Sequence, residues 1–365
     1  MKKICMIAGM IFLIGFLAKP SAAIAQAGEE DLAAFLEASE ADASKLITAY
    51  LQPVVRSLSY SMTGGWYTTA KAHSTLGFDL SISVNAAFIP TAENFFDPNK
   101  LGLSASTVYN GARDNGSTGP FNPSRKAPTI FGPKDETRYT STYDPDGAGP
   151  IPIQTNTFNG PEGFDVKNEI GVAAIPTPMV QLGIGVIKNT DVKFRFIPEQ
   201  EVGSSKIKMF GIGVLHDIKQ HIAGIKLLPF DLSALIAYNS VTGSTDLSSD
   251  GSGGVPASPN GVGDYKFNSW VFQALISKKI SVLTGYAGVG YNMVNTNVDV
   301  KGDYTIVSDG AYSYVITDPV AIDFKNKSMR FTLGMRLKLG PIFFNGDYTF
   351  QKYNTLSVGF GVAVR

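Results

Sequence analysis

From Ser328 to Val364, apolar and polar residues alternate along the chain with few interruptions. The first run carries an apolar residue at every second position: Met329, Phe331, Leu333, Met335, Leu337 and Leu339. The pattern restarts after Gly340-Pro341 and again after Asn354. A period of two is the period of a β-strand whose two faces meet different environments. The segment therefore predicts three consecutive strands with one apolar face and one polar face.

The turn at Gly340-Pro341 sets the register of the first two of these strands. Glycine at the first central position suits a type II′ hairpin turn. This turn makes one face apolar and the other polar, with the following residues opposed: Leu339 and Ile342, Leu337 and Phe344, Phe331 and Phe350, Arg336 and Asn345. Arg336 also lies diagonal to Asp347, within reach of a long side chain. Each strand has the roughly 9–11 residues that a tilted membrane-spanning strand requires.

The N-terminus has the pattern of a secretory signal peptide over residues 1–25. Lys2 and Lys3 precede an apolar run from Cys5 to Leu17, and the small-residue site Ala23-Ile24-Ala25 follows. The apolar run is too short for a comfortable transmembrane helix. A lipoprotein acceptor cysteine would lie at the end of the run, whereas the single cysteine lies at its start, so we expect no lipidation. The mature chain then has no disulfide and no thiolate metal site.

Composition and compartment together favour the bacterial outer membrane. The chain carries 31 basic and 31 acidic residues, a balance that gives no indication of nucleic-acid binding. Its 38 glycines and 23 phenylalanines suit a glycine-tolerant, aromatic-rich barrel. No segment after the signal offers the roughly 20 continuous apolar residues of a membrane helix. The sequence therefore predicts an all-β, transmembrane antiparallel β-barrel, monomeric and without a cofactor, whose partners are outer-membrane lipid and the barrel assembly machinery.

The mature chain divides into an N-terminal segment and a barrel. Residues 26–63 show helical spacing and predict a short helix that either lies in the periplasm at the barrel rim or enters the lumen as a plug. Residues 64–365 form the barrel, with long extracellular loops near 97–165, 242–262 and 295–326. Ten strands are clear, and weaker candidates raise the expected number to about 12–14, because single-chain bacterial barrels use even numbers.

Several polar residues have the parity of the lumen side of their strands, and their charges are of mixed sign. The candidate lumen-lining residues are Asp79, Asn85, Arg330, Arg336, Asn345 and Asp347. They indicate either a lumen of solvated, cross-paired side chains or a polar ring that filters or orients a solute. Trp66 and Tyr67 are candidate ligand contacts, with the interfacial aromatic girdle as the alternative.

The sequence contains no catalytic signature. His216 and His221 lie beside Asp217 and indicate either a metal site or ordinary rim residues. The chain has no Cys/His cluster, G-x-S-x-G elbow, HExxH motif or P-loop, and no matched pair of carboxylates. We therefore predict that the protein is not an enzyme and has no catalytic, cofactor-binding or metal-binding residue.

Four strands carry pairs of glycines on the lumen side: Gly183 and Gly185, Gly211 and Gly213, Gly288 and Gly290, Gly359 and Gly361. Glycine within a strand marks curvature or the close approach of another backbone. The pairs therefore indicate either barrel curvature or room for the N-terminal segment as a plug.

Motifs across most of the mature chain resemble an uncharacterised family of outer-membrane barrels from Bacteroidota-type bacteria, distantly similar to the FadL-like long-chain fatty-acid transporters. The motifs are GGWYTTAKAH (64–73), LGFDLSISVN (76–85), QLGIGVIKNTDVKFRFIP (181–198), GVLHDIK (213–219) and GDYTFQKYNTLSVGFGV (346–362). The resemblance implies a barrel of about fourteen strands, an N-terminal hatch and a route for a hydrophobic solute. The chain departs from that pattern because it lacks the plug motif of the classical transporters and ends in Val364-Arg365 rather than in an aromatic residue.

The barrel pattern together with this resemblance predicts passive uptake of a small hydrophobic solute through a partly plugged lumen. The alternative is a structural or surface-interaction protein of the outer membrane that transports nothing and uses its long loops.

Overall fold

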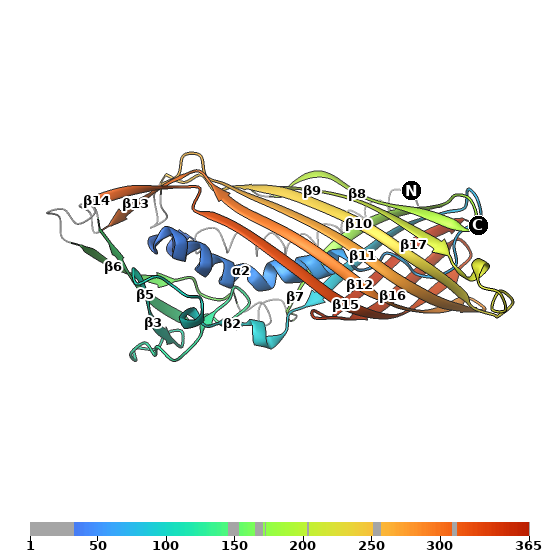
Figure 1. Ribbon diagram of the computed structural model, residues 1–365, viewed down its shortest axis with the longest axis horizontal. Coiled ribbons are helices and arrows are strands. Elements are labelled where there is room, and N and C mark those ends of the chain that lie inside the picture. Colours follow the sequence, from blue (N-terminus) through green and yellow to red (C-terminus); the bar gives the residue numbers. More distant parts are fainter. Residues whose placement is uncertain are drawn as a thin grey trace, which may run out of the picture.

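The computed structural model describes residues 33–144, 153–164, 171, 173–202, 204–250, 257–308 and 312–364. The predicted signal peptide lies outside the described residues. Within them, ten antiparallel strands close into a barrel (Figure 1). In barrel order the strands are β1 (Phe78–Phe88), β17 (Thr355–Val364), β16 (Ile342–Phe350), β15 (Val320–Leu339), β12 (Leu283–Lys301), β11 (Val262–Ile280), β10 (Asp231–Asp246), β9 (Ser205–Asp217), β8 (Thr190–Val202) and β7 (Ala174–Gly185). β1 pairs with both β17 and β7 and so closes the ring.

Alternation decides which side chains face outward. Phe331, Leu333 and Phe344 are 44%, 47% and 52% exposed, although they are large and apolar. Their polar neighbours Arg330 and Thr332 are buried inside the barrel. An exposed apolar band around a polar interior is the arrangement of a transmembrane barrel.

The predicted C-terminal hairpin is confirmed. Leu339 pairs with Ile342, Phe331 with Phe350, and Arg336 with Asn345. Gly340 has a φ of +62°, a conformation that glycine adopts without steric cost.

The predicted number of about 12–14 barrel strands is wrong, because the β-segments of the long connections pair with one another outside the barrel. β2 (Phe95–Phe96) pairs with β4 (Ala127–Pro128), and β13 (Asp303–Ser308) pairs with β14 (Tyr312–Thr317). β3 (Thr107–Arg113), β5 (Glu136–Tyr143) and β6 (Gln154–Gly160) form a three-stranded sheet. Two predicted loops, 242–262 and 295–326, are also shorter than expected, because β10, β11, β12 and β15 continue their pairing into them.

The N-terminal segment begins with the short helix η1 (Ala33–Glu37) and continues as the helix α2 (Glu40–Met62). α2 runs along the barrel axis from the sheet of β5 and β6 into the barrel (Figure 1). Its contacts are with β1, β7, β11, β12 and β15. The helix therefore occupies the lumen instead of lying on the periplasmic rim.

One junction of the barrel wall is only half paired. β7 pairs with β8 from Gln181 to Gly185, whereas the Ala174–Val180 half of β7 pairs with β1 alone. Pro176 and Pro178 lie in that half, and proline cannot donate to a neighbouring strand. We call this half-paired junction between β7 and β8 the seam. Gly185 lies at the end with short turns, so the seam lies in the half of the wall nearer the long connections.

Candidate functional site: the plugged lumen

The segment after α2 is extended and runs through the rest of the barrel toward the end with short turns, where β1 begins. Thr69 and Ala70 contact the wall through Ser277, whose hydroxyl accepts a hydrogen bond from the Ala70 N–H at 2.9 Å. The Ser233 hydroxyl donates to the Ala70 carbonyl. We call residues 40–73, the helix with this extended segment, the plug.

Wall side chains hold the plug where α2 ends. Arg195 donates to the Met62 carbonyl at 3.2 Å and to the Gly64 carbonyl at 2.8 Å. Arg330 donates to the Thr63 carbonyl at 2.8 Å. Amides from four further strands complete this set, which we call the lumen ring: Asn85, Gln181, Arg195, Asn239, Asn292 and Arg330.

The ring suits the chemistry of a helix C-terminus. The last carbonyl groups of a helix have no partner within the helix and carry its partial negative charge. Donors are therefore required inside the lumen, and a guanidinium supplies both donors and positive charge. In the barrel order β8 and β15 are separated by five steps in either direction, so Arg195 and Arg330 reach the same turn from opposite walls.

Two aromatic residues of the plug, Trp66 and Tyr67, follow the turn that the lumen ring holds. Trp66 is 1% exposed, and the Arg195 guanidinium carbon lies 3.8 Å from the centre of its ring. The Tyr67 hydroxyl accepts a hydrogen bond from Gln273 at 2.9 Å. The interfacial girdle, the alternative considered for Trp66 and Tyr67, is therefore wrong, because both side chains are inside the lumen.

The part of the barrel wall that faces Trp66 and Tyr67 from β9, β10 and β11 is apolar. Trp66, Tyr67 and Ala70 form a buried cluster with side chains of β9, β10 and β11, which we call the apolar strip: Leu215, Leu235, Ala237, Val271 and Leu275. The lumen is therefore amphipathic, with the apolar strip below polar ring residues.

At the end of the plug, His73 is held between two carboxylates. Its ring Nδ1 lies 2.9 Å from the Asp191 carboxylate and its ring Nε2 lies 3.4 Å from the Asp79 carboxylate. Its backbone N–H donates to Asp191 at 2.8 Å. All three side chains are buried, with exposures of 8% or less. This contact fixes the point at which the plug leaves the barrel.

Three other predicted lumen residues lie on the wall away from the ring. Arg336 stacks on Phe343, with 3.9 Å from the guanidinium carbon to the ring centre. Asn345 is buried opposite Arg336. Asp347 does not pair with Arg336 as the diagonal register predicted, because its carboxylate accepts a hydrogen bond from the Tyr286 hydroxyl at 3.0 Å.

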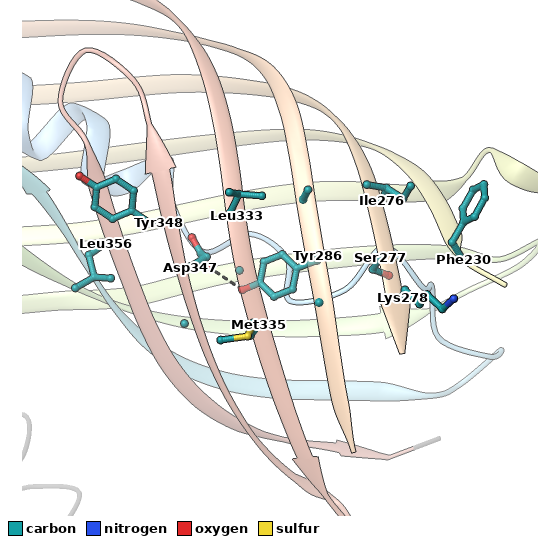
Figure 2. A pocket seen from close by; sticks show the side chains of 14 residues that line it. Phe230, Ile276, Ser277, Lys278, Tyr286, Leu333, Met335, Asp347, Tyr348 and Leu356 are labelled. Carbon is teal, nitrogen blue, oxygen red and sulfur yellow. Dashed lines mark hydrogen bonds between the residues drawn. The ribbon is translucent and has the colours of Figure 1, made fainter. Parts of the chain in front are cut away.

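The outer side of this wall carries an apolar groove. Leu333, Met335, Tyr348 and Leu356 line it, and Tyr286 and Asp347 point toward each other behind it (Figure 2). Gly334 lies between them, and a side chain there would collide with the Tyr286 ring. The groove therefore lies on the lipid-facing side, and the Tyr286–Asp347 hydrogen bond belongs to the interior.

A family model described as "Family of unknown function (DUF6588)" matches residues 1–364. The chain belongs to this family. The comparison with curated proteins returns no match. Nothing in the family match bears on FadL-like transporters or on a bacterial group, and both stay predictions.

Three solved structures are similar to this DUF6588 chain. The translocator domain of autotransporter NalP from Neisseria meningitidis has 12% identity and a TM-score of 0.30, covering 88% of this chain and 98% of its own. The outer membrane transporter YddB from Escherichia coli has 9% identity and a TM-score of 0.28, covering 79% and 41%. Ail, the attachment invasion locus protein of Yersinia pestis, has 10% identity and a TM-score of 0.24, covering 51% and 97%. These three neighbours are outer-membrane barrels.

Some of the lumen glycines make room for the plug. A Cβ on Gly213 would lie 3.0 Å from the Trp66 ring, one on Gly288 would lie 2.2 Å from the Tyr67 hydroxyl, and one on Gly185 would lie 2.3 Å from the Ser74 carbonyl. The other five glycines instead lie against side chains or backbone of the wall: Gly183, Gly211, Gly290, Gly359 and Gly361. Room for the plug is therefore confirmed at Gly185, Gly213 and Gly288, and barrel curvature stays a prediction for the other glycines.

Gly185→Ala is expected to expel the end of the plug, because the added methyl group meets backbone rather than a movable side chain. Overpacking of this kind costs about 1–3 kcal/mol. The measurement is gel electrophoresis of samples of the purified protein that were first incubated at a series of temperatures. The melting temperature is the one at which the band of the folded protein disappears. Gly285→Ala is the matched control, since nothing lies within 4 Å of a Cβ there. Equal melting temperatures for the two variants would contradict this steric account.

The outer end of α2 is fixed to the first long connection. The Asp42 carboxylate accepts hydrogen bonds from the Ser104 N–H at 3.0 Å and from the Ser39 hydroxyl at 2.8 Å, and Lys45 lies 3.1 Å away. Burial raises the pKa of this carboxyl, but the hydrogen bonds outweigh burial and lower the pKa to about 2. The charged form is therefore the form that anchors the helix.

This anchor is expected to weaken in acid. A depressed pKa stabilises the folded form above the ordinary value of 3.8, and the stabilisation is lost as the pH falls from there toward about 2. We expect the hydrogen-exchange protection factors of the first turns of α2 to fall over that range. Asp42→Asn is expected to lower protection about tenfold at pH 6, since charge-assisted hydrogen bonds are worth about 1.5–3 kcal/mol. An acid dependence that persists unchanged in Asp42→Asn would show that another group is responsible.

The sequence interpretation missed several site residues. Arg195 lies between the apolar Phe194 and Phe196, so the alternation of the sequence predicts that its side chain faces the lumen. Asn239 has the same signal between Tyr238 and Ser240, in a weaker form. No local pattern showed that these side chains bind the plug backbone.

The remaining histidines lie at the barrel end with short turns. The Nε2 atoms of His216 and His221 are 2.9 Å apart, and His216 Nδ1 lies 2.8 Å from the Thr190 hydroxyl. Within the described ranges, no group of three or more His, Cys, Asp or Glu side chains is placed to hold a metal ion. In the same part of the chain, no helix combines the length and apolar character needed to cross a membrane.

Proposed function

We propose that this outer-membrane β-barrel takes up a small hydrophobic solute passively, through a lumen that opens when the plug moves. The observation that carries the proposal is the seam. The Ala174–Val180 half of β7 makes no strand pairing with β8. The helix α2 covers this gap from inside the barrel, and the Ser61 and Thr177 hydroxyl oxygens are 2.7 Å apart. A shift of the helix would connect the lumen laterally with the hydrocarbon of the membrane.

The apolar strip supports a hydrophobic solute. In the closed protein Trp66 and Tyr67 cover it. Displacement of these rings would leave an apolar surface inside the lumen, and apolar surface favours apolar ligands by roughly 25 cal/mol for each Å² removed from water. A hydrophobic molecule could therefore occupy the place of the aromatic rings.

The nature of the plug contacts supports motion. The ring and the plug are joined by hydrogen bonds. Each bond from a neutral amide contributes a net 0.5–1.5 kcal/mol or so, and each of the three from a guanidinium group about 1.5–3 kcal/mol. The mature chain has no cysteine after Cys5, so no disulfide fixes the plug. The proposal includes a monomer that contacts outer-membrane lipid directly and is inserted by the barrel assembly machinery. It includes no chemical step.

The test is accumulation of a small hydrophobic dye in intact cells that produce the full-length protein. We expect faster accumulation than in cells with an empty vector, and loss of the difference when the plug is cross-linked to the wall. Equal accumulation in all three would reject uptake.

The second candidate is a structural or surface-interaction protein. The observation that favours it is the solid outer layer, in which Phe35 packs edge-on against Tyr50 and Tyr139, and Tyr139 stacks on Phe158. Arg113 and Glu136 form an ion pair at 2.6 Å on the same layer. If the dye experiment fails, the three-stranded sheet of β3, β5 and β6 outside the barrel becomes the leading functional region.

A further inference from the structure

The turn that ends α2 occupies a position built for negative charge. Its three successive carbonyl oxygens, those of Met62, Thr63 and Gly64, receive N–H groups from two guanidinium groups. Arg195 is 1% exposed and Arg330 is 3% exposed. Among the described residues, no carboxylate lies within 4.0 Å of either guanidinium, although buried cations are usually paired with an acid.

We propose that Arg195 and Arg330 form an anion-binding constriction, and that the Met62–Gly64 turn fills it while the protein is closed. The carbonyl oxygens stand in for the oxygens of an anionic group. When the plug moves, the two arginines lose these partners and present their donors to the solute. The site would accept a carboxylate, phosphate or sulfate group, or a small inorganic anion.

The donor geometry supports an anion rather than a neutral solute. Arg195 uses Nη1 and Nη2 on two oxygens at 3.2 and 2.8 Å, the forked arrangement that guanidinium groups make with oxyanions. The Nε atom of Arg330 has no hydrogen-bond partner among the described residues, so this buried side chain has spare donor capacity. An anion with several oxygens could use that donor as well as the one now given to Thr63.

The surrounding groups leave the constriction positive. The other members of the lumen ring are uncharged amides. Asn85, Asn239 and Asn292 also donate to the turn, and Gln181 donates to the Trp66 carbonyl just after it. The acid nearest along the wall is Asp347, whose carboxylate already accepts the Tyr286 hydroxyl. The remaining buried wall charges lie nearer the end with short turns and are mixed in sign: Asp79, Asp191, Lys193 and Arg336. Rings of arginine are a general device for anion selection in pores.

This inference rests on the proposed function, because the arginines meet a solute only when the plug has moved. Uptake through the lumen could nevertheless be real and the anion site wrong. The experiment therefore separates the two by measuring opening and charge selectivity independently.

The experiment is single-channel recording of the full-length protein in planar bilayers under a KCl gradient. The reversal potential of the openings gives the permeability of chloride relative to potassium. We expect chloride to be favoured over potassium by about 25-fold, because one unit charge acting at about 4 Å in water attracts the anion about fivefold and repels the cation about fivefold. Inorganic phosphate at millimolar concentration is expected to reduce the chloride current.

Paired substitutions separate charge from simple support of the plug. Arg195→Gln with Arg330→Gln removes the charge and should abolish the chloride preference and the phosphate block. Arg195→Lys with Arg330→Lys keeps the charge but loses the fork, so it should keep the preference and weaken the block. Lys206→Gln with Lys208→Gln removes equal charge from exposed positions and should leave selectivity unchanged.

The outcomes are distinct. Absence of openings under every condition would overturn the anion site, and absence of openings together with dye accumulation at the empty-vector level would overturn the proposed function as well. Openings that favour potassium, or that lack any charge preference in the unmodified protein, would overturn the anion site alone. That second result needs no variant, so a glutamine variant that fails to fold does not protect the inference.

Discussion

Oxidation of a protein that carries Ser61→Cys and Thr177→Cys is expected to abolish its openings in planar bilayers. The hydroxyl oxygens of these residues are 2.7 Å apart, one on α2 and the other on β7 at the seam. Sulfur atoms in these positions can approach bonding distance, and the resulting disulfide would fix the helix against the wall. A reducing agent should restore the openings to the level of the unmodified protein. Each single cysteine variant should respond to neither treatment.

A second cysteine pair controls for stiffening of the wall itself. Ser205 and Thr245 have hydroxyl oxygens 2.8 Å apart on β9 and β10, and neither belongs to the plug. Oxidation of Ser205→Cys with Thr245→Cys should leave the openings unchanged. If both oxidised pairs conduct as well as the reduced protein, motion of α2 at the seam is not part of the conduction path.

Trp66→Ala is expected to raise the ratio of open to closed time of single channels by about two to three and a half orders of magnitude. The ring is buried between Arg195 and Gly213, and truncation of a buried tryptophan costs about 3–5 kcal/mol. Every 1.4 kcal/mol is a factor of about ten in an equilibrium. The loss falls on the closed form, because the open form no longer makes the contact. The measurement is the fraction of time that single channels spend open.

The chain offers a matched control, because its second tryptophan lies on the other side of the wall. Trp270 is 45% exposed on the lipid-facing side of β11, where it stacks on Phe272. Trp270→Ala removes the same group without touching the plug and should leave the open fraction within a factor of about two, as surface substitutions usually change stability by less than 0.5 kcal/mol or so. Similar open fractions in the two variants would show that Trp66 does not hold the plug closed.

The outer face of the barrel was predictable from sequence because it depends on a local pattern. Residues such as Phe331 and Leu333 alternate with polar neighbours, and this parity alone decides which side meets lipid. The strand count was overestimated because parity says nothing about partners. Segments such as Thr107–Arg113 and Glu136–Tyr143 have strand character, yet they pair with each other outside the barrel.

The candidate site was predicted only in part, because it depends on where a distant segment lies. Asn85 and Arg330 were recognised by parity, and both contact the plug. Arg195 has the same parity signal, but its importance follows from the Met62 and Gly64 carbonyls, more than 130 positions away. No sequence pattern shows that α2 lies in the lumen. The wall side chains that bind the plug backbone could therefore be identified only once the path of the plug was known.

The path of the plug also constrains how the protein can be assembled. The chain leaves the plug and soon enters β1, and β1 pairs with β17, the barrel strand that lies farthest along the described chain. A cylinder that closed before α2 had entered would have to admit the bulky helix through a narrow opening lined with inward side chains. The helix is therefore expected to be in place while the sheet is still open, so that the curling sheet wraps around it. In that order the N-terminal segment serves as a template for the final joining of the first and last strands.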